Sequence, residues 1–338
     1  MFDKDIPIPL TAGELAQLWS QYLNDSASIC ILTYFLEKAE DKEIQPVIEY
    51  ALEISKLHTQ KITALLTDEK SKVPHGFCTE KDIDINAPRL YSDSFVLNFI
   101  NQMSKVGLTL YGAAVSSSAR SDIKAYFINC LEETIELNKR STDLLLSKGL
   151  FIRAPSIPYI EEVEVVKKQW FMLDVFGEKR PLIASEVDNL FNNLQRNALG
   201  VATLTGFSQV AENKDVKQFF LKGIEIGNKH LKLFRGKLEE SKLPAPMTWD
   251  SEVTNSTTHT FSERLMMYFT SGLIAMSVGY YGTGASQSPR GDIPSMYNRL
   301  SLEIQMYAED GANIMIKNGW MEQPPIAADR DELIREKK

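Results

Sequence analysis

Two histidines, His58 and His230, are the side chains of this sequence best suited to metal or proton chemistry. Each lies on an apolar stripe whose members recur every three or four residues, which predicts a place on the inner face of a helix. Glu133 and Glu303 stand at nearly matching levels of a later helix. A buried histidine and glutamate would form a charge-assisted hydrogen bond, and the carboxylate would raise the pKa of the histidine. We therefore predict two structural His–Glu pairs.

A di-iron centre of the kind found in four-helix bundles needs a glutamate from each of two helices and a Glu-x-x-His motif from each of the other two. Only one histidine recurs in each half of this sequence. Glu53 precedes His58 by five residues, which turns the two side chains about 140° apart on a helix. The sequence therefore predicts no cofactor, no metal and no catalytic residue. His58, Glu133, His230 and Glu303 are weak candidates for some other metal ion.

An internal duplication determines where these residues stand. Residues 9–14 reappear at 181–186, a spacing of 172, and residues 111–123 reappear at 281–293, a spacing of 170. His58 and His230 share the first spacing, and Glu133 and Glu303 share the second. A repeat this long predicts two whole domains rather than a solenoid of small units.

Inside each copy the apolar period is helical, with expected helices near residues 12–37, 42–67, 95–111 and 122–148 in the first. The first and third connections are short, and the second has roughly 20 residues, enough to return along a helix of about 37 Å. This order of connections, short then long then short, favours a ferritin-like bundle with a single crossover. The alternative is an up-down bundle with a loose loop. The predicted fold is all-α, with two tandem ferritin-like four-helix bundles.

We predict a first bundle at residues 1–155, a connector at 156–180 and a second bundle at 181–338. The connector contains Trp170, Phe171 and Phe176, which is too aromatic for a free linker. It is therefore expected to be ordered and to pack across the bundles.

The paired Pro-Leu-x-Ala-x-Glu openings, the single histidine of each second helix and residues 176–182 between the copies resemble the family named domain of unknown function 3231. The resemblance covers nearly the whole chain. It implies a ferritin-like tandem bundle from Bacillus or its relatives, some of whose members carry a spore coat label. It implies no activity and no catalytic residues.

The amino-acid composition indicates which kinds of partner and which cellular compartment are expected. With 37 basic and 45 acidic residues the net charge is −8, which disfavours nucleic acid and anionic lipid as partners. Three cysteines are an odd number in a long chain, which favours free thiols in a reducing compartment. No apolar stretch reaches 18 residues and the start lacks a signal peptide pattern, so we expect a soluble cytoplasmic protein that could associate with the spore.

Three functions fit these observations. The first is a non-enzymatic structural or interaction protein that binds a protein partner or itself. The second is a degenerate ferritin-like metal-binding protein or oxidoreductase that retains His58 and His230. The third is a binder of a small ligand in a cavity between helices.

Overall fold

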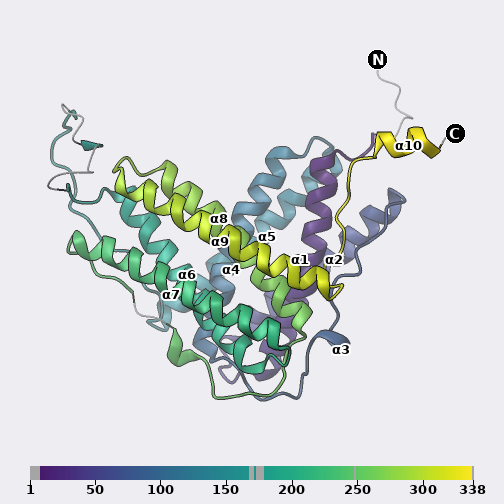
Figure 1. The fold of residues 1–338 in the computed structure, drawn as a ribbon. Coiled ribbons are helices and arrows are strands. Elements are labelled where there is room, and N and C mark those ends of the chain that lie inside the picture. Colours follow the sequence, from purple (N-terminus) through teal and green to yellow (C-terminus); the bar gives the residue numbers. More distant parts are fainter. Residues whose placement is uncertain (1–7, 167–170, 173–178, 247–248, 337–338) are drawn as a thin grey trace.

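Long helices dominate the computed structural model, which describes residues 8–166, 171–172, 179–246 and 249–336 (Figure 1). Each half supplies four of them, so the prediction of an all-α fold of tandem bundles is confirmed. The first half has α1 (Ala12–Lys38), α2 (Gln45–Asp68), α4 (Asp93–Ser117) and α5 (Ser121–Ser147). The second has α6 (Ala184–Val210), α7 (Lys214–Glu240), α8 (Glu263–Ser286) and α9 (Asp292–Lys317). Three short elements complete the described helices: α3 (Thr79–Asp82), η2 (Asp250–Glu252) and α10 (Arg330–Glu336).

The helix ends follow local chemistry that both copies repeat. Ser92 and Ser262 precede α4 and α8, and each hydroxyl accepts a hydrogen bond from a backbone N–H of the first turn at 3.1 Å. Gly149 and Gly319 follow α5 and α9 with φ of +68°, a conformation that glycine adopts without strain. The duplication therefore preserved the signals that start and stop these helices.

The long second connection of each copy carries the chain back to the end of the bundle where the second helix began. Asp93, at the start of α4, accepts hydrogen bonds from the N–H groups of Glu40 and Asp41 in the α1–α2 turn. Glu263, at the start of α8, accepts the same pair of bonds from Glu212 and Asn213 in the α6–α7 turn. The predicted single crossover is therefore present in both copies.

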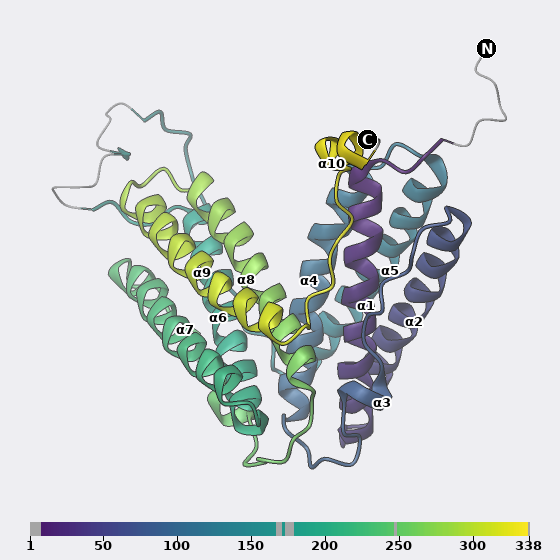
Figure 2. The same ribbon diagram turned by 45° about the vertical axis from the view of Figure 1, so that its right-hand side comes forward.

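The two crossovers pair with each other in an antiparallel and reciprocal manner. Isolated bridges join Ile83 to Phe261 and Tyr91 to Val253. At the spacing of 170, Ile83 corresponds to Val253 and Tyr91 to Phe261, so the second bridge is the duplicate of the first. The side chains follow the same pattern, since Ser262 Oγ donates to Asp82 at 2.6 Å and Ser92 Oγ donates to Glu252. The bundles therefore meet at their crossover ends and diverge from there (Figure 2).

Aromatic side chains from both copies form a common core at this junction. Phe261 packs edge-on against Tyr34 with ring centroids 5.0 Å apart, and Phe99 stacks on Phe269 at 5.3 Å. Phe207 lies 5.9 Å from Phe261, so rings of both bundles interleave. These large buried rings hold the bundles together, because aromatic burial supplies much of the apolar free energy of a core.

The connector differs from the expectation in its described part. Tyr159 is 99% exposed, and Ile160 and Val163 are also exposed, so this stretch does not pack across the bundles. Burial stops with Phe151 and Ile152, which contact the core beside α5. Phe171 lies under the guanidinium of Arg180 at 4.4 Å, whereas Trp170 and Phe176 lie outside the described residues. The apolar composition of the connector does not by itself make residues 159–163 pack, because packing also needs a complementary surface on the bundles.

Candidate functional site

The first histidine is buried inside the first bundle. His58 on α2 is 3% exposed, and its Nε2 lies 2.7 Å from Oε2 of Glu133 on α5. The predicted pair is therefore confirmed. Glu53 faces solvent, as the five-residue spacing requires.

The other ring nitrogen of His58 faces a second carboxylate. Nδ1 lies 3.3 Å from Oδ2 of Asp25, a buried residue of α1. Three helices thus bring an imidazole and two carboxylates together in the interior of the bundle. Asp25 was not among the candidates from the sequence.

This arrangement favours the charged imidazole. Burial by itself would lower the pKa of His58, but hydrogen bonding to Asp25 and Cys130 outweighs it and raises the pKa to about 11. His58 is therefore an imidazolium at neutral pH, held between Asp25 and Glu133. The site then carries one positive and two negative groups, a net charge of −1 when both carboxylates are ionised.

Further polar groups surround the ion pair. Gln21 Nε2 donates to the sulfur of Cys130 at 3.6 Å and to the hydroxyl of Tyr111 at 3.1 Å. Beside the ion pair, Gln21 Oε1 and the hydroxyl of Tyr126 are buried and make no hydrogen bond within the described residues, and Asp25 Oδ2 has only its contact with Nδ1 of His58. Buried polar atoms are usually satisfied, so unsatisfied ones next to a cavity mark places where a ligand can bind.

The second copy holds the equivalent histidine in a neutral environment. His230 is buried, with Nε2 at 3.1 Å from Glu303 and Nδ1 at 2.9 Å from the hydroxyl of Tyr281. That hydroxyl also bonds to Asn197, which stands where the first copy has Asp25. Burial lowers the pKa of His230, because no second carboxylate opposes it and the nearby Lys229 disfavours the charge.

A cavity of about 500 Å³ adjoins His58. Asp25, Gln21 and Tyr111 line its polar inner part, and the remaining wall is mostly apolar. Residues 268–276 of α8 close one side, so the second bundle forms part of the wall. A volume of this size is typical of sites that hold a small molecule.

The cavity also divides the core of the first bundle. Leu18, Ile62, Leu66 and Phe127 form a separate apolar cluster beyond it, near the end of the bundle away from the junction. The second bundle has one continuous core, because Phe234, Tyr281 and Leu300 there belong to the shared cluster.

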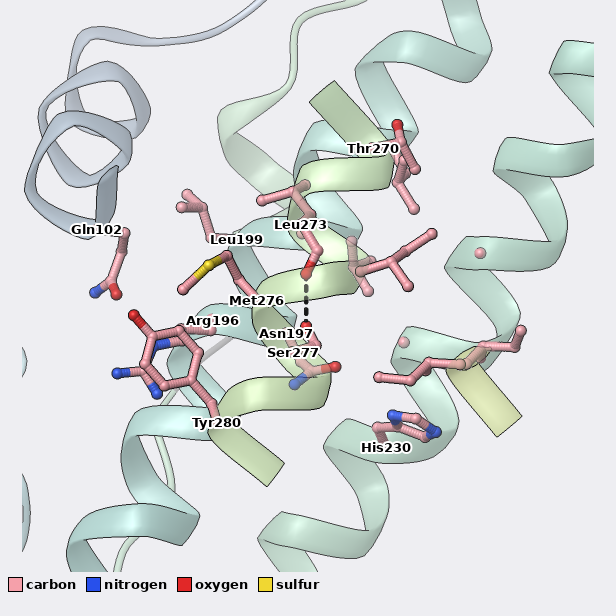
Figure 3. A pocket seen from close by; sticks show the side chains of 18 of the residues that line it. Gln102, Arg196, Asn197, Leu199, His230, Thr270, Leu273, Met276, Ser277 and Tyr280 are labelled. Carbon is pink, nitrogen blue, oxygen red and sulfur yellow. Dashed lines mark hydrogen bonds between the residues drawn. The ribbon is translucent and has the colours of Figure 1, made fainter. Parts of the chain in front are cut away.

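The corresponding cavity in the second bundle measures only about 100 Å³. Figure 3 shows His230 on one side of it, with Arg196 and Tyr280 together on the other. The guanidinium of Arg196 stacks on the Tyr280 ring at 3.5 Å, and Gln102 reaches the rim from α4.

Larger side chains account for the lost volume. Ser104, Thr134 and Leu137 line the first cavity, and the duplicate has Ile274, Ile304 and Tyr307 at these positions. A Cβ on Gly223 would overlap the hydroxyl of Tyr307, so the tyrosine fits only because the duplicate has glycine where the first copy has Ala51. The two bundles therefore keep one scaffold but differ in the space that they enclose.

Sequence reasoning identified both histidines and both glutamates but missed Asp25 and Gln21 as members of the site. A signal was present for Asp25, since it lies seven residues after Leu18 and so on the same apolar stripe of the helix. A polar residue, Asn197, also stands at the equivalent position of the second copy. The apolar stripe that contains Cys130 predicts a small hydrophobe at this position, but its sulfur faces the site. The duplicate has Leu300 there, which does not distinguish these roles.

Fold and site together define a tandem helical-bundle protein in which one bundle keeps a buried ionic site beside a cavity. The model of the family described as Protein of unknown function (DUF3231) matches residues 4–163 and again residues 170–333. The chain belongs to this family, with one family unit in each half.

Other comparisons concern the fold alone. A solved structure from Bacillus halodurans with a spore coat label is similar at 18% identity and a TM-score of 0.40, covering 45% of this chain and 98% of that one. No curated protein matches the sequence significantly. Among the described residues, no helix is long and apolar enough to cross a membrane.

Proposed function

We propose that the first bundle binds a small amphipathic molecule in the cavity beside His58. The observation that carries this proposal is the contrast between the copies: about 500 Å³ is kept open in one bundle and about 100 Å³ in its duplicate. The duplicate fills the equivalent space with larger side chains, so a volume that the first bundle keeps open is a candidate for occupation by a ligand. Of the three functions that fit the sequence, the cavity favours the small-ligand binder.

The lining indicates the chemical class of the ligand. The apolar walls suit a hydrocarbon chain or ring. At the inner part, Gln21 Oε1 is a buried oxygen that accepts no hydrogen bond within the described chain, and Asp25 Oδ2 has only its contact with Nδ1 of His58 at 3.3 Å. With the net charge of −1 around His58, these acceptors suit the hydrogen-bond donors of a protonated amine. The ligand is therefore an amine with an apolar body.

Thermal shift and calorimetry with three probe series test the proposal: primary alkylamines, the matching alcohols and the matching fatty acids. A ligand that binds only the folded chain raises the melting temperature by mass action. Amines are expected to bind most tightly and fatty acids least, with affinity that rises with chain length until the cavity is filled. Equal shifts for all three series, or none, would contradict the assignment.

Two variants transfer the filling residues of the second bundle to the first. Ser104→Ile, and the double change Ala51→Gly with Leu137→Tyr, are expected to reduce amine affinity at least tenfold while the chain stays folded, since each pattern already packs in the duplicate. Leu302→Tyr is the matched control, because it adds the same bulk on an exposed part of α9. Unchanged affinity in both filled variants would show that the ligand binds elsewhere.

The structural or interaction role, a protein partner or self-association, and a cytoplasmic or spore-associated location remain predictions from the sequence. They are compatible with a ligand-binding bundle, since binding in the first cavity also contacts α8 of the second bundle.

A further inference from the structure

Three metal-ligating groups of different types lie together around His58, which itself lines the first cavity. A ring nitrogen of His58, the sulfur of Cys130 and a carboxylate oxygen of Glu133 all lie within 4.8 Å of one another, and Nε2 is the nitrogen that faces Glu133, at 2.7 Å. Cys130 and Glu133 are three residues apart on α5 and so share a face of the helix, and His58 faces them from α2. No other group of this kind occurs among the described residues.

We propose that His58, Cys130 and Glu133 form a mononuclear site for a divalent cation of the zinc class. Imidazole nitrogen, thiolate sulfur and carboxylate oxygen are the three ligand types that Zn²⁺ takes in proteins. Three protein ligands leave a fourth position for water or for a ligand in the adjoining cavity. The site does not depend on the proposed binding of an amine.

Asp25 completes the arrangement from the far side of the ring. A histidine that ligates through Nε2 commonly donates its Nδ1–H to a carboxylate, which orients the ring and makes the ligating nitrogen more basic. Oδ2 of Asp25 lies 3.3 Å from Nδ1 of His58, which suits this role. Asp25 is therefore a positioning residue rather than a ligand.

The duplicate differs at the positions that matter for a cation. It has Leu300 for Cys130 and Asn197 for Asp25, so it lacks the thiol and the orienting carboxylate. It also has Lys229, which pairs with Glu303 at 2.8 Å, whereas the first copy has Leu57 there. Arg299 likewise replaces Asn129. Each difference makes the first site more favourable to a cation than the second.

An ion can reach the site from solvent. The side chain of Glu133 is 23% exposed, whereas that of His58 is 4% exposed, so the carboxylate stands at the entrance. In the metal-free state the imidazolium donates to Glu133, and metal binding replaces this proton and the thiol proton.

The test uses the full chain without an affinity tag, stripped with a chelator and titrated separately with Zn²⁺ and Co²⁺. One equivalent is expected to bind, and Co²⁺ should produce thiolate-to-metal charge-transfer absorption in the near ultraviolet. Absence of binding, or binding without this absorption, would overturn the proposal.

Three variants assign the ligands. Cys130→Ser should abolish the charge-transfer absorption and weaken Zn²⁺ binding at least tenfold. Glu133→Gln should weaken Zn²⁺ binding about tenfold and keep the absorption. If circular dichroism shows that the serine variant does not fold, the Glu133→Gln result tests the proposed site instead. His230→Ala, the matched change in the second bundle, should alter neither. Absorption that persists in Cys130→Ser would place the ion at another cysteine and refute the site.

Discussion

Nδ1 of His58 lies 3.3 Å from a carboxylate oxygen of Asp25, in the interior of the first bundle. In the second bundle an amide, that of Asn197, occupies the position of this carboxylate. The duplication therefore provides an internal comparison, because the same histidine on the same scaffold is flanked by two carboxylates in one copy and by one in the other.

The first prediction concerns the charge of the two histidines. His58 should be protonated at pH 8, because Asp25 helps to raise its pKa to about 11, whereas His230 should be neutral at pH 7 because burial lowers its pKa. Asp25→Asn should lower the pKa of His58, and the reciprocal Asn197→Asp should raise that of His230. Nitrogen chemical shifts of the imidazole rings across a pH series measure both. A neutral His58 at pH 8 in the metal-free wild type would show that the carboxylate does not control its charge.

The second prediction concerns how the charge of His58 changes the free energy of unfolding with pH. The folded-state pKa of His58 lies above its unfolded value of about 6.5, so the stabilisation is complete below pH 6.5 and is lost as the pH rises toward about 11. The difference in unfolding free energy between wild type and Asp25→Asn should be roughly 1 to 3 kcal/mol at pH 6 and should shrink at higher pH.

Denaturant titrations at several pH values measure this difference. The exposed Asp188→Asn, the same change on the surface of α6, is the control and should stay within about 0.5 kcal/mol throughout. A difference that grows with rising pH would have the wrong sign for a charged His58.

A third prediction compares two buried glutamates at equivalent positions. Glu186 is 0% exposed and binds the guanidinium of Arg180 through two hydrogen bonds of 2.8 and 2.9 Å. Glu14, its counterpart, accepts only from backbone N–H groups and the cap of α1. Glu186→Gln should therefore destabilise by roughly 3 to 5 kcal/mol, because it breaks a buried ion pair, and Glu14→Gln by about 1 to 3 kcal/mol.

Both effects should fade in acid. Burial raises the pKa of each carboxyl, but hydrogen bonds outweigh burial and leave both pKa values below 4.5. The stabilisation is present above the unfolded pKa and is lost as the pH falls through the lower folded value. Chemical unfolding at pH 7 and at pH 3 checks the order, and equal costs for the two variants at pH 7 would refute the role of Arg180.

The fourth prediction tests the junction between the bundles. Phe261 packs against Tyr34 of the first copy and Phe207 of the second, so Phe261→Ala should cost about 3 to 5 kcal/mol. Tyr159→Ala, which removes a ring that is 99% exposed, should change stability by less than about 0.5 kcal/mol. Calorimetry of both variants measures the difference, and a small loss in Phe261→Ala would show that the crossovers contribute little to holding the bundles together.

Much of this architecture could be predicted from the sequence because its signals are local or repeated. Helical periodicity and the stop at Gly149 depend on neighbours within a few turns, and the duplication makes each signal appear twice. The pairing of His58 with Glu133 was also predictable, because both lie on helices of known rise and direction. For the connector, composition did not specify which part would pack: Tyr159 is exposed, whereas Phe171 lies against Arg180, because burial depends on whether a complementary surface exists.

Tertiary structure alone decided the site. Asp25, Cys130 and Tyr111 come from three helices that are far apart in the sequence, and their convergence depends on how each helix is rotated about its axis, which an apolar stripe restricts only loosely. The sequence left a cavity between helices as one of three possibilities and could not place it, because the volume left empty depends on small differences between the space inside a bundle and the side chains that fill it. One exchange, Leu137 in the first copy for Tyr307 in the second, contributes to whether that space is open or closed. The sequence by itself therefore determined the scaffold, through short-range and periodic forces, and long-range packing determined what the scaffold encloses.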